Sequence, residues 1–138
     1  DIGSGVDIGA GASGSAGSIF MLQKYSGDAR NYTKVHSNNI FIEYTGWSRG
    51  DGFFCLRRND AFDFINSRNN VNTTFSDTST TKTAYPIWIS ALNDNGNPAF
   101  YSARETAFAS IGDGVSDVEL ANYYTAVQAF QTTLSRNV

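Results

Sequence analysis

SDVELANYYTAVQAFQTTLSR, residues 116–136, is the stretch that decides the architecture, because it carries the one strong helix signal in the chain. Ser116 and Glu119 match a capping box, in which the serine hydroxyl accepts the Glu119 backbone N–H and the glutamate accepts the serine N–H. Apolar residues then recur three and four positions apart, on one stripe of a helix: Leu120, Tyr123, Val127, Phe130 and Leu134. The pattern predicts a helix over about residues 117–135, with this stripe buried against a sheet.

Upstream of this helix, short apolar runs alternate with turns rich in Gly, Asn, Asp and Pro. The expected strands cover residues 19–22, 40–44, 53–57, 62–65, 85–92, 99–101 and 106–111, and the polar stretch 66–82 is expected to be a loop with one weak strand. The turn signals come at hairpin spacing and favour antiparallel pairing throughout. The predicted fold class is therefore mainly all-β, an antiparallel β-sandwich with one C-terminal α-helix.

The length of 138 residues fits one domain that buries a substantial core. We expect residues 18–138 to form this single domain. Residues 1–17 are rich in Gly, Ala and Ser, which is typical of a connector between structured parts. An edge strand is the alternative, since Val6, Ile8 and Ala10 alternate with Asp7 and Gly9.

Composition and charge exclude several partners. The formal net charge of −3 gives no general attraction to phosphate backbones, so we expect no nucleic-acid partner. No apolar run approaches the roughly twenty residues that a membrane helix needs, so we expect no membrane insertion. The single Cys55 stands in an apolar run, which favours a buried structural thiol over a nucleophile.

Residues for enzymatic chemistry are sparse. The glutamates Glu43, Glu105 and Glu119 stand alone, whereas glycosidic hydrolysis needs two carboxyl groups facing the same bond. His36 is the only histidine, which makes a nucleophile and base pair hard to build. We therefore expect no catalytic residues and no resident cofactor. A polysaccharide hydrolase remains an alternative, although turn chemistry explains the aspartate pair at positions 60 and 63 more simply than catalysis does.

Two kinds of binding site stay open at this point. Calcium prefers oxygen ligands in loops, and Asp94, Asn95 and Asp113 are the candidates, although none has the full EF-hand spacing. Sugar binding needs an aromatic platform with polar groups beside it. The sequence offers such a set in its turns: Trp47, Arg49, Asp51 and Asn95.

The C-terminal part resembles the ending of phage and prophage virion-surface proteins that finish in a concanavalin A-like, laminin-G-like domain. The resemblance rests on FASIGDG at 108–114, Ser116-Asp117 with Glu119, YTAVQAFQTTL at 124–134 and Arg136, together with IWISA at 87–91 and NDNG at 93–96. It implies a sandwich of the concanavalin A-like or jelly-roll type, and it brings no catalytic residues.

The resemblance also implies a setting. Such domains sit at the ends of tail-fibre, baseplate or head-fibre proteins, on the extracellular surface of a virion, where repeated copies face the host. We therefore expect a non-enzymatic structural or adhesion module whose partners are its own copies, other virion proteins and host surface glycans. A purely structural decoration without a ligand is a further alternative.

Overall fold

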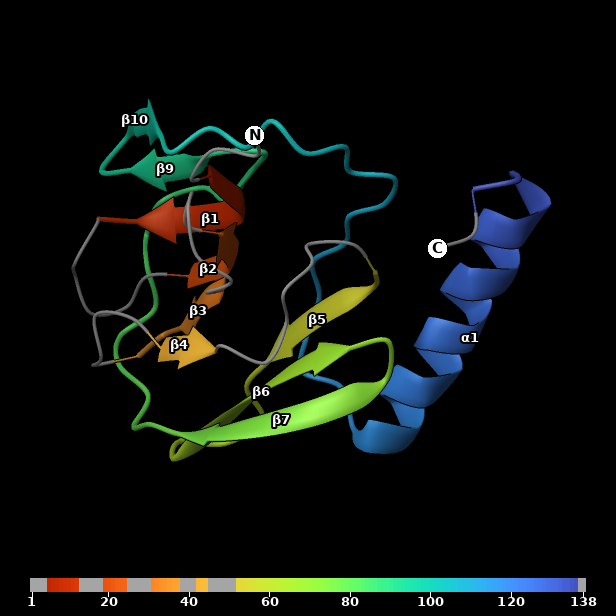
Figure 1. The fold of residues 1–138 in the computed structure, drawn as a ribbon. Helices are drawn as coiled ribbons and strands as arrows, with labels where there is room; N and C mark the ends of the chain where they lie inside the picture. Colours follow the sequence, from red (N-terminus) through yellow and green to blue (C-terminus); the bar gives the residue numbers. More distant parts are fainter. Residues whose placement is uncertain (1–4, 13–18, 25–30, 38–41, 45–51, 137–138) are drawn as a thin grey trace.

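The computed structural model describes residues 5–12, 19–24, 31–37, 42–44 and 52–136. These residues form strands in two sheets and one C-terminal helix, α1 (Asp117–Thr133), as Figure 1 shows. The arrangement is consistent with a β-sandwich. The mainly-β class with one C-terminal helix that the sequence predicts is therefore confirmed.

The larger sheet has the strand order β10, β9, β1, β2, β3, β4, and β8 also pairs with β1. Its strands are β1 (Gly5–Gly11), β2 (Ile19–Lys24), β3 (Asn31–Val35), β4 (Ile42–Tyr44), β8 (Trp88–Ile89), β9 (Leu92–Asp94) and β10 (Asn97–Ala99). The pairs β1–β2, β2–β3, β3–β4 and β9–β10 are antiparallel. The sheet thus contains hairpin-like neighbours on both sides of β1.

A reversal of the chain at Ser90 makes one pairing parallel. Ile89 lies opposite Ile8 in an antiparallel pair, whereas Leu92 lies opposite Gly9 in a parallel pair. Between them Ser90 has a positive φ of 63°, which turns the backbone. The expectations of one straight strand over residues 85–92 and of antiparallel pairing throughout are both wrong, because this turn divides the strand.

The strand β1 lies inside the sheet, between β9 and β2. Val6 and Ala10 have no exposed surface there. A Cβ on Gly5 would lie 2.5 Å from the backbone oxygen of Tyr101, so only glycine permits this close approach. Neither a connector nor an edge strand describes Gly5–Gly11, because its small residues let two neighbouring strands pair with it.

The smaller sheet is a meander of β5 (Phe54–Arg57), β6 (Asp63–Arg68) and β7 (Val71–Ser76). The two-residue turn between β6 and β7 consists of Asn69 and Asn70, which have positive φ angles of 49° and 63°. Two positive φ angles are the signature of a type I′ turn, whose twist matches that of the flanking strands. This turn fixes the register of the hairpin.

Aromatic rings and an arginine side chain pack against each other at the smaller sheet. Phe64 is fully buried and its ring stacks on Phe75 with a centroid distance of 5.1 Å. The Arg58 guanidinium lies over the Phe64 ring, and its Nε donates to the backbone oxygen of Val35 in the larger sheet. The Arg58 side chain thus joins the two sheets by a hydrogen bond.

Residues 106–111, expected as a strand, belong to no strand. They are part of the long segment that leads from the larger sheet to α1 (Figure 1). Phe108 and Ile111 are exposed, and Ser110 accepts a hydrogen bond of 2.6 Å from the Tyr123 hydroxyl. Phe108 contacts α1 through the ring of Tyr123, so this aromatic residue packs on the helix and has no place in a sheet.

The buried face of α1 differs from the expected stripe. Leu120 and Val127 are buried as expected, and Tyr123 is half-buried against the rings of Phe53 and Phe108. Two other members of the stripe, Phe130 and Leu134, are exposed at 50% and 44%. The third buried residue is the neighbour of Phe130, Gln131, about 100° further round the helix. The expectation is therefore wrong for Phe130 and Leu134, because the helix is rotated toward its polar side.

Candidate functional site

The structure places only part of the expected sugar site. Trp47, Arg49 and Asp51 lie outside the described residues. Asn95 is described and stands exposed at the turn between β9 and β10, with a positive φ of 53°. Its backbone N–H donates to the oxygen of Gly11 over 2.9 Å, which fastens the turn to the end of β1.

A neighbouring aromatic residue completes what we call the hairpin tip, which consists of Tyr85 and residues 93–97. The Tyr85 hydroxyl donates a hydrogen bond to Oδ1 of Asn95. Asn93 is buried and its side chain holds the turn in place. It donates to the backbone oxygen of Pro86 and accepts the Gly96 N–H, each over 2.9 Å. The tip therefore presents an aromatic ring beside an exposed amide on a hydrogen-bonded base.

Sequence reasoning missed Tyr85 as a site residue. The sequence pattern predicts a strand at this position, and the partner Asn95 lies ten residues away across the Ser90 reversal. The only signal in the sequence is the Tyr-Pro pair at positions 85 and 86, because proline biases the preceding residue toward an extended backbone.

The calcium candidates fall on two different elements. Asp94 ends β9 and Asn95 follows it, whereas Asp113 lies in the segment before α1. Within the described ranges, no group of three or more His, Cys, Asp and Glu side chains is arranged to hold a metal ion.

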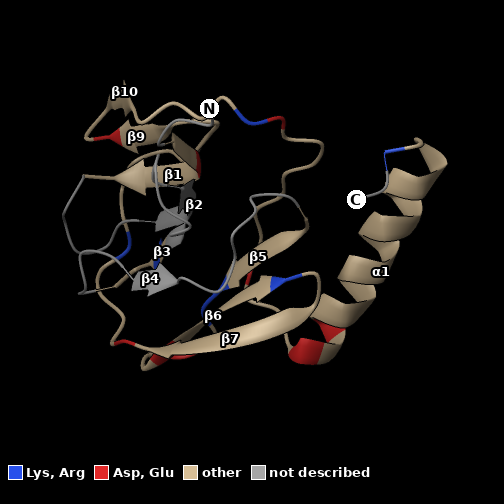
Figure 2. Ribbon diagram, in the orientation of Figure 1, with Lys and Arg blue, Asp and Glu red and all other residues tan. Residues whose placement is uncertain are grey.

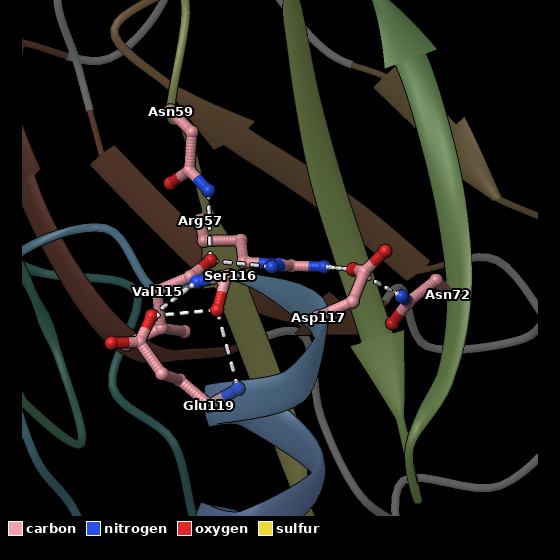
Figure 3. Close-up of polar contacts among 7 residues, drawn as sticks. All are labelled: Arg57, Asn59, Asn72, Val115, Ser116, Asp117 and Glu119. Carbon is pink, nitrogen blue, oxygen red and sulfur yellow. Dashed lines mark hydrogen bonds and ion pairs between the residues drawn. The ribbon is translucent and has the colours of Figure 1, made fainter.

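The start of α1 holds the second polar cluster (Figure 3). Ser116 and Glu119 form both hydrogen bonds of the capping box, and Oε2 of Glu119 also accepts the Ser116 hydroxyl over 2.7 Å. Buried Arg57 donates to the backbone oxygen of Val115 and to Oδ1 of Asp117. The same carboxylate oxygen accepts a bond of 2.9 Å from Asn72 Nδ2. The cluster binds α1 to β5 and β7.

The charges of this cluster suit a structural role. Figure 2 shows acidic residues at the first turn of α1, where Asp117 and Glu119 face the positive end of the helix dipole. The hydrogen bonds from the Ser116 backbone and hydroxyl lower the pKa of Glu119. Hydrogen bonds from the backbone of Asp63 and Phe62 likewise lower the pKa of Asp60, so the two aspartates considered for hydrolysis form a turn.

A third cluster joins the segment after β10 to β1. Asp7 accepts the Ser102 hydroxyl over 2.6 Å and Arg104 Nε over 2.8 Å, and Arg104 Nη2 donates to the oxygen of Gly5 over 2.9 Å. Burial raises the pKa of Asp7, while Ser102 and Arg104 act in the opposite direction. The carboxylate is thereby held in the ion pair that fixes this segment.

Two further groups have pKa values set mainly by burial. Burial lowers the pKa of Lys34 on β3, and nearby Asp77 opposes this effect. Burial raises the pKa of the Cys55 thiol, which Arg57 only partly offsets. A raised pKa leaves less of the nucleophilic thiolate at neutral pH, and Cys55 is half-buried where the sequence predicts a buried thiol.

Comparisons with known proteins give no relative for this chain. Neither a protein-family model, nor a curated protein, nor a solved structure matches it. Within the part that the structure describes, no helix combines the length and the apolar character needed to cross a membrane.

Proposed function

We propose that this chain is a non-enzymatic structural and adhesion module on the surface of a phage-like virion, in a tail or head fibre. We further propose that its sandwich is of the concanavalin A-like or jelly-roll type. The two sheets and the single C-terminal helix support the fold proposal. The resemblance carried by residues 87–96 and 107–136 supports the setting.

The single observation that carries the adhesion role is the pair of Tyr85 and Asn95. A sugar offers an apolar face and a rim of hydroxyl groups, and an aromatic ring beside an amide matches both. Asn95 is exposed, and the Tyr85 hydroxyl holds its side chain in place. Preorganisation of this kind reduces the entropy lost on binding.

One such contact binds weakly, so the mechanism we propose is multivalent. Many copies on one particle raise the effective concentration of the remaining sites once the first has bound. The ligand proposed is therefore a repeated glycan on the host surface.

The experiment is a glycan array probed with the chain as single molecules and as many copies displayed on a bead. Binding by the displayed form is expected, and Asn95→Ala and Tyr85→Ala should each weaken it about tenfold or more, as the loss of roughly 1.4 kcal/mol implies. Asn122→Ala, an exposed change on α1, is the matched control and should bind as the parent does.

Three outcomes would contradict parts of the proposal. Absence of binding by both forms would overturn the adhesion role and favour a purely structural decoration. Binding that survives both tip substitutions would place the site elsewhere. Release of reducing ends from host polysaccharide would show a hydrolase and overturn the non-enzymatic role.

A further inference from the structure

The outer edge of β7 has no strand paired to it among the residues that the structure describes. Within these ranges β7 pairs with β6 alone and forms the last strand of its sheet. In Figure 1 it lies at the lower border of the molecule, with the first turn of α1 beside the end at which Asn72 binds Asp117. An edge strand of this kind presents a row of backbone donors and acceptors to any chain that approaches.

The register shows which groups point outward. Phe62 O accepts the Asp77 N–H over 2.6 Å, and Val71 lies opposite Arg68 across a two-residue turn, so the odd-numbered residues of β7 bond to β6. The bond from Asn69 N–H to Phe53 O, on the far side of β6, agrees with this alternation. The backbone groups of the even-numbered residues therefore face away from β6: Asn72, Thr74 and Ser76.

This edge lacks the usual protection. Residues 71–76, VNTTFS, contain no charge, no proline and no glycine, all of which weaken or block edge pairing. By contrast, the outer strand of the larger sheet, β10, carries Pro98. Asn72, Thr74 and Ser76 are all exposed, and of these Asn72 already donates its amide to Asp117 at the start of α1.

We propose that β7 pairs antiparallel with β7 of a second copy of this chain, about a two-fold axis at Thr74. In this register Thr74 faces Thr74 of the partner, and Asn72 faces Ser76. Every outward backbone amide and carbonyl of these residues then meets a partner, and registers shifted along the strand leave some of them unmatched. The pairing brings no like charges together, and Thr74 can hydrogen-bond Thr74 of the partner, while the Asn72 amide keeps its bond to Asp117.

A second copy suits this edge better than an unrelated strand because the arrangement is self-complementary. A two-fold interface uses the same patch on both chains, and the outward residues are spaced evenly on either side of Thr74. One strand pair buries less than the roughly 1,200 Å² that is typical of stable interfaces. The dimer is therefore weak, and the fraction of chains in it rises with concentration. This inference stands independently of the glycan proposal.

The first test is sedimentation equilibrium over a wide range of chain concentration. The parent chain should shift from monomer toward dimer as concentration rises. Thr74→Lys, which would set two positive charges face to face at the axis, should remain monomeric with an unchanged melting temperature, and Thr74→Ser should dimerise as the parent does. A parent that stays monomeric throughout, or a Thr74→Lys variant that still dimerises, overturns the proposal.

The second test fixes the register by cross-linking in a Cys55→Ser background, which removes the native thiol. Thr74→Cys should form a disulfide-linked dimer under mild oxidation, because the two substituted positions face each other at Cα separations that a disulfide spans. Ser76→Cys should not link to itself, yet should link to Asn72→Cys when the two variants are mixed. Failure of Thr74→Cys to cross-link, or equal linking by Ser76→Cys alone, overturns the register.

Discussion

Arg58, directly after β5, donates a hydrogen bond of 2.9 Å from its Nε to the backbone oxygen of Val35 in the other sheet. The same side chain donates to the backbone oxygen of Asp77 over 2.7 Å and lies over the ring of Phe64. Its side chain is only 7% exposed. One guanidinium thus connects β3, the end of β7 and the aromatic core of the smaller sheet.

Arg58→Met should destabilise the fold by about 3–5 kcal/mol, because it leaves buried acceptors and the Asp77 carboxylate without this cation. The free energy of unfolding in urea measures the change. Arg136→Met, at an exposed position beyond α1, is the control and should change it by less than about 0.5 kcal/mol. A loss below about 1 kcal/mol for Arg58→Met would show that the tie is dispensable.

The rotation of α1 predicts unequal costs for two apolar residues. Leu120→Ala should cost about 2–5 kcal/mol, because Leu120 is fully buried. Phe130→Ala should cost less than about 1 kcal/mol, since half of the side chain is already exposed. Thermal and urea unfolding of both variants test this. Equal losses would mean that Phe130 is covered by a partner in solution.

The capping box predicts a pH dependence. The pKa of Glu119 is lowered in the fold from its ordinary value of 4.5, so its stabilising contribution is present above that value and is lost as pH falls through the lower folded pKa. Glu119→Gln keeps an acceptor but cannot titrate. The difference in melting temperature between parent and variant should therefore shrink as the solution is acidified from neutral pH.

Ser116→Ala provides the matched comparison for this titration. It removes the hydroxyl that donates to Glu119, so the pH-dependent part of the difference should be smaller in that background. A gap between parent and Glu119→Gln that stays constant with pH would contradict the assignment.

The close approach at Gly5 predicts a steric effect. Gly5→Ala should cost more than about 1 kcal/mol, because its Cβ would meet backbone atoms of Tyr101 and Ser102 at 2.5 and 2.7 Å. Gly112→Ala meets nothing within 4 Å and should be neutral, or stabilising by up to about 1 kcal/mol. The melting temperatures of the two variants test this. A Gly5→Ala variant as stable as the parent would contradict the close approach of residues 101–102 to Gly5.

Features that depend on neighbouring residues were predictable from the sequence. The start of α1 follows from Ser116 and Glu119, whose roles are set within one helical turn. The buried face was not predictable, because it depends on what packs against the helix. A polar residue, Gln131, is buried where periodicity favoured Phe130, and hydrophobicity carries no signal for that exchange.

Long-range relationships were also beyond the sequence. Glycine in β1 suggested a connector, yet its small size permits pairing on both sides, which only the positions of β9 and Tyr101 reveal. The reversal at Ser90 breaks a run whose other residues are mostly apolar, so composition does not mark it. The contact of Tyr85 with Asn95 depends on that reversal, so only the structure reveals that Tyr85 belongs to the hairpin tip.

The parallel pairing of β1 with β9 sets an order for folding. During synthesis β1 and β2 precede β8 and β9, so among the described strands the other side of β1 has no partner until residues 88–94 have left the ribosome. The larger sheet therefore forms completely only after β9 has been synthesised. The contact of β1 with β9 joins residues far apart in sequence, which makes folding slow. Until then the nascent chain exposes an unpaired inner strand, which favours production at low temperature or with chaperones.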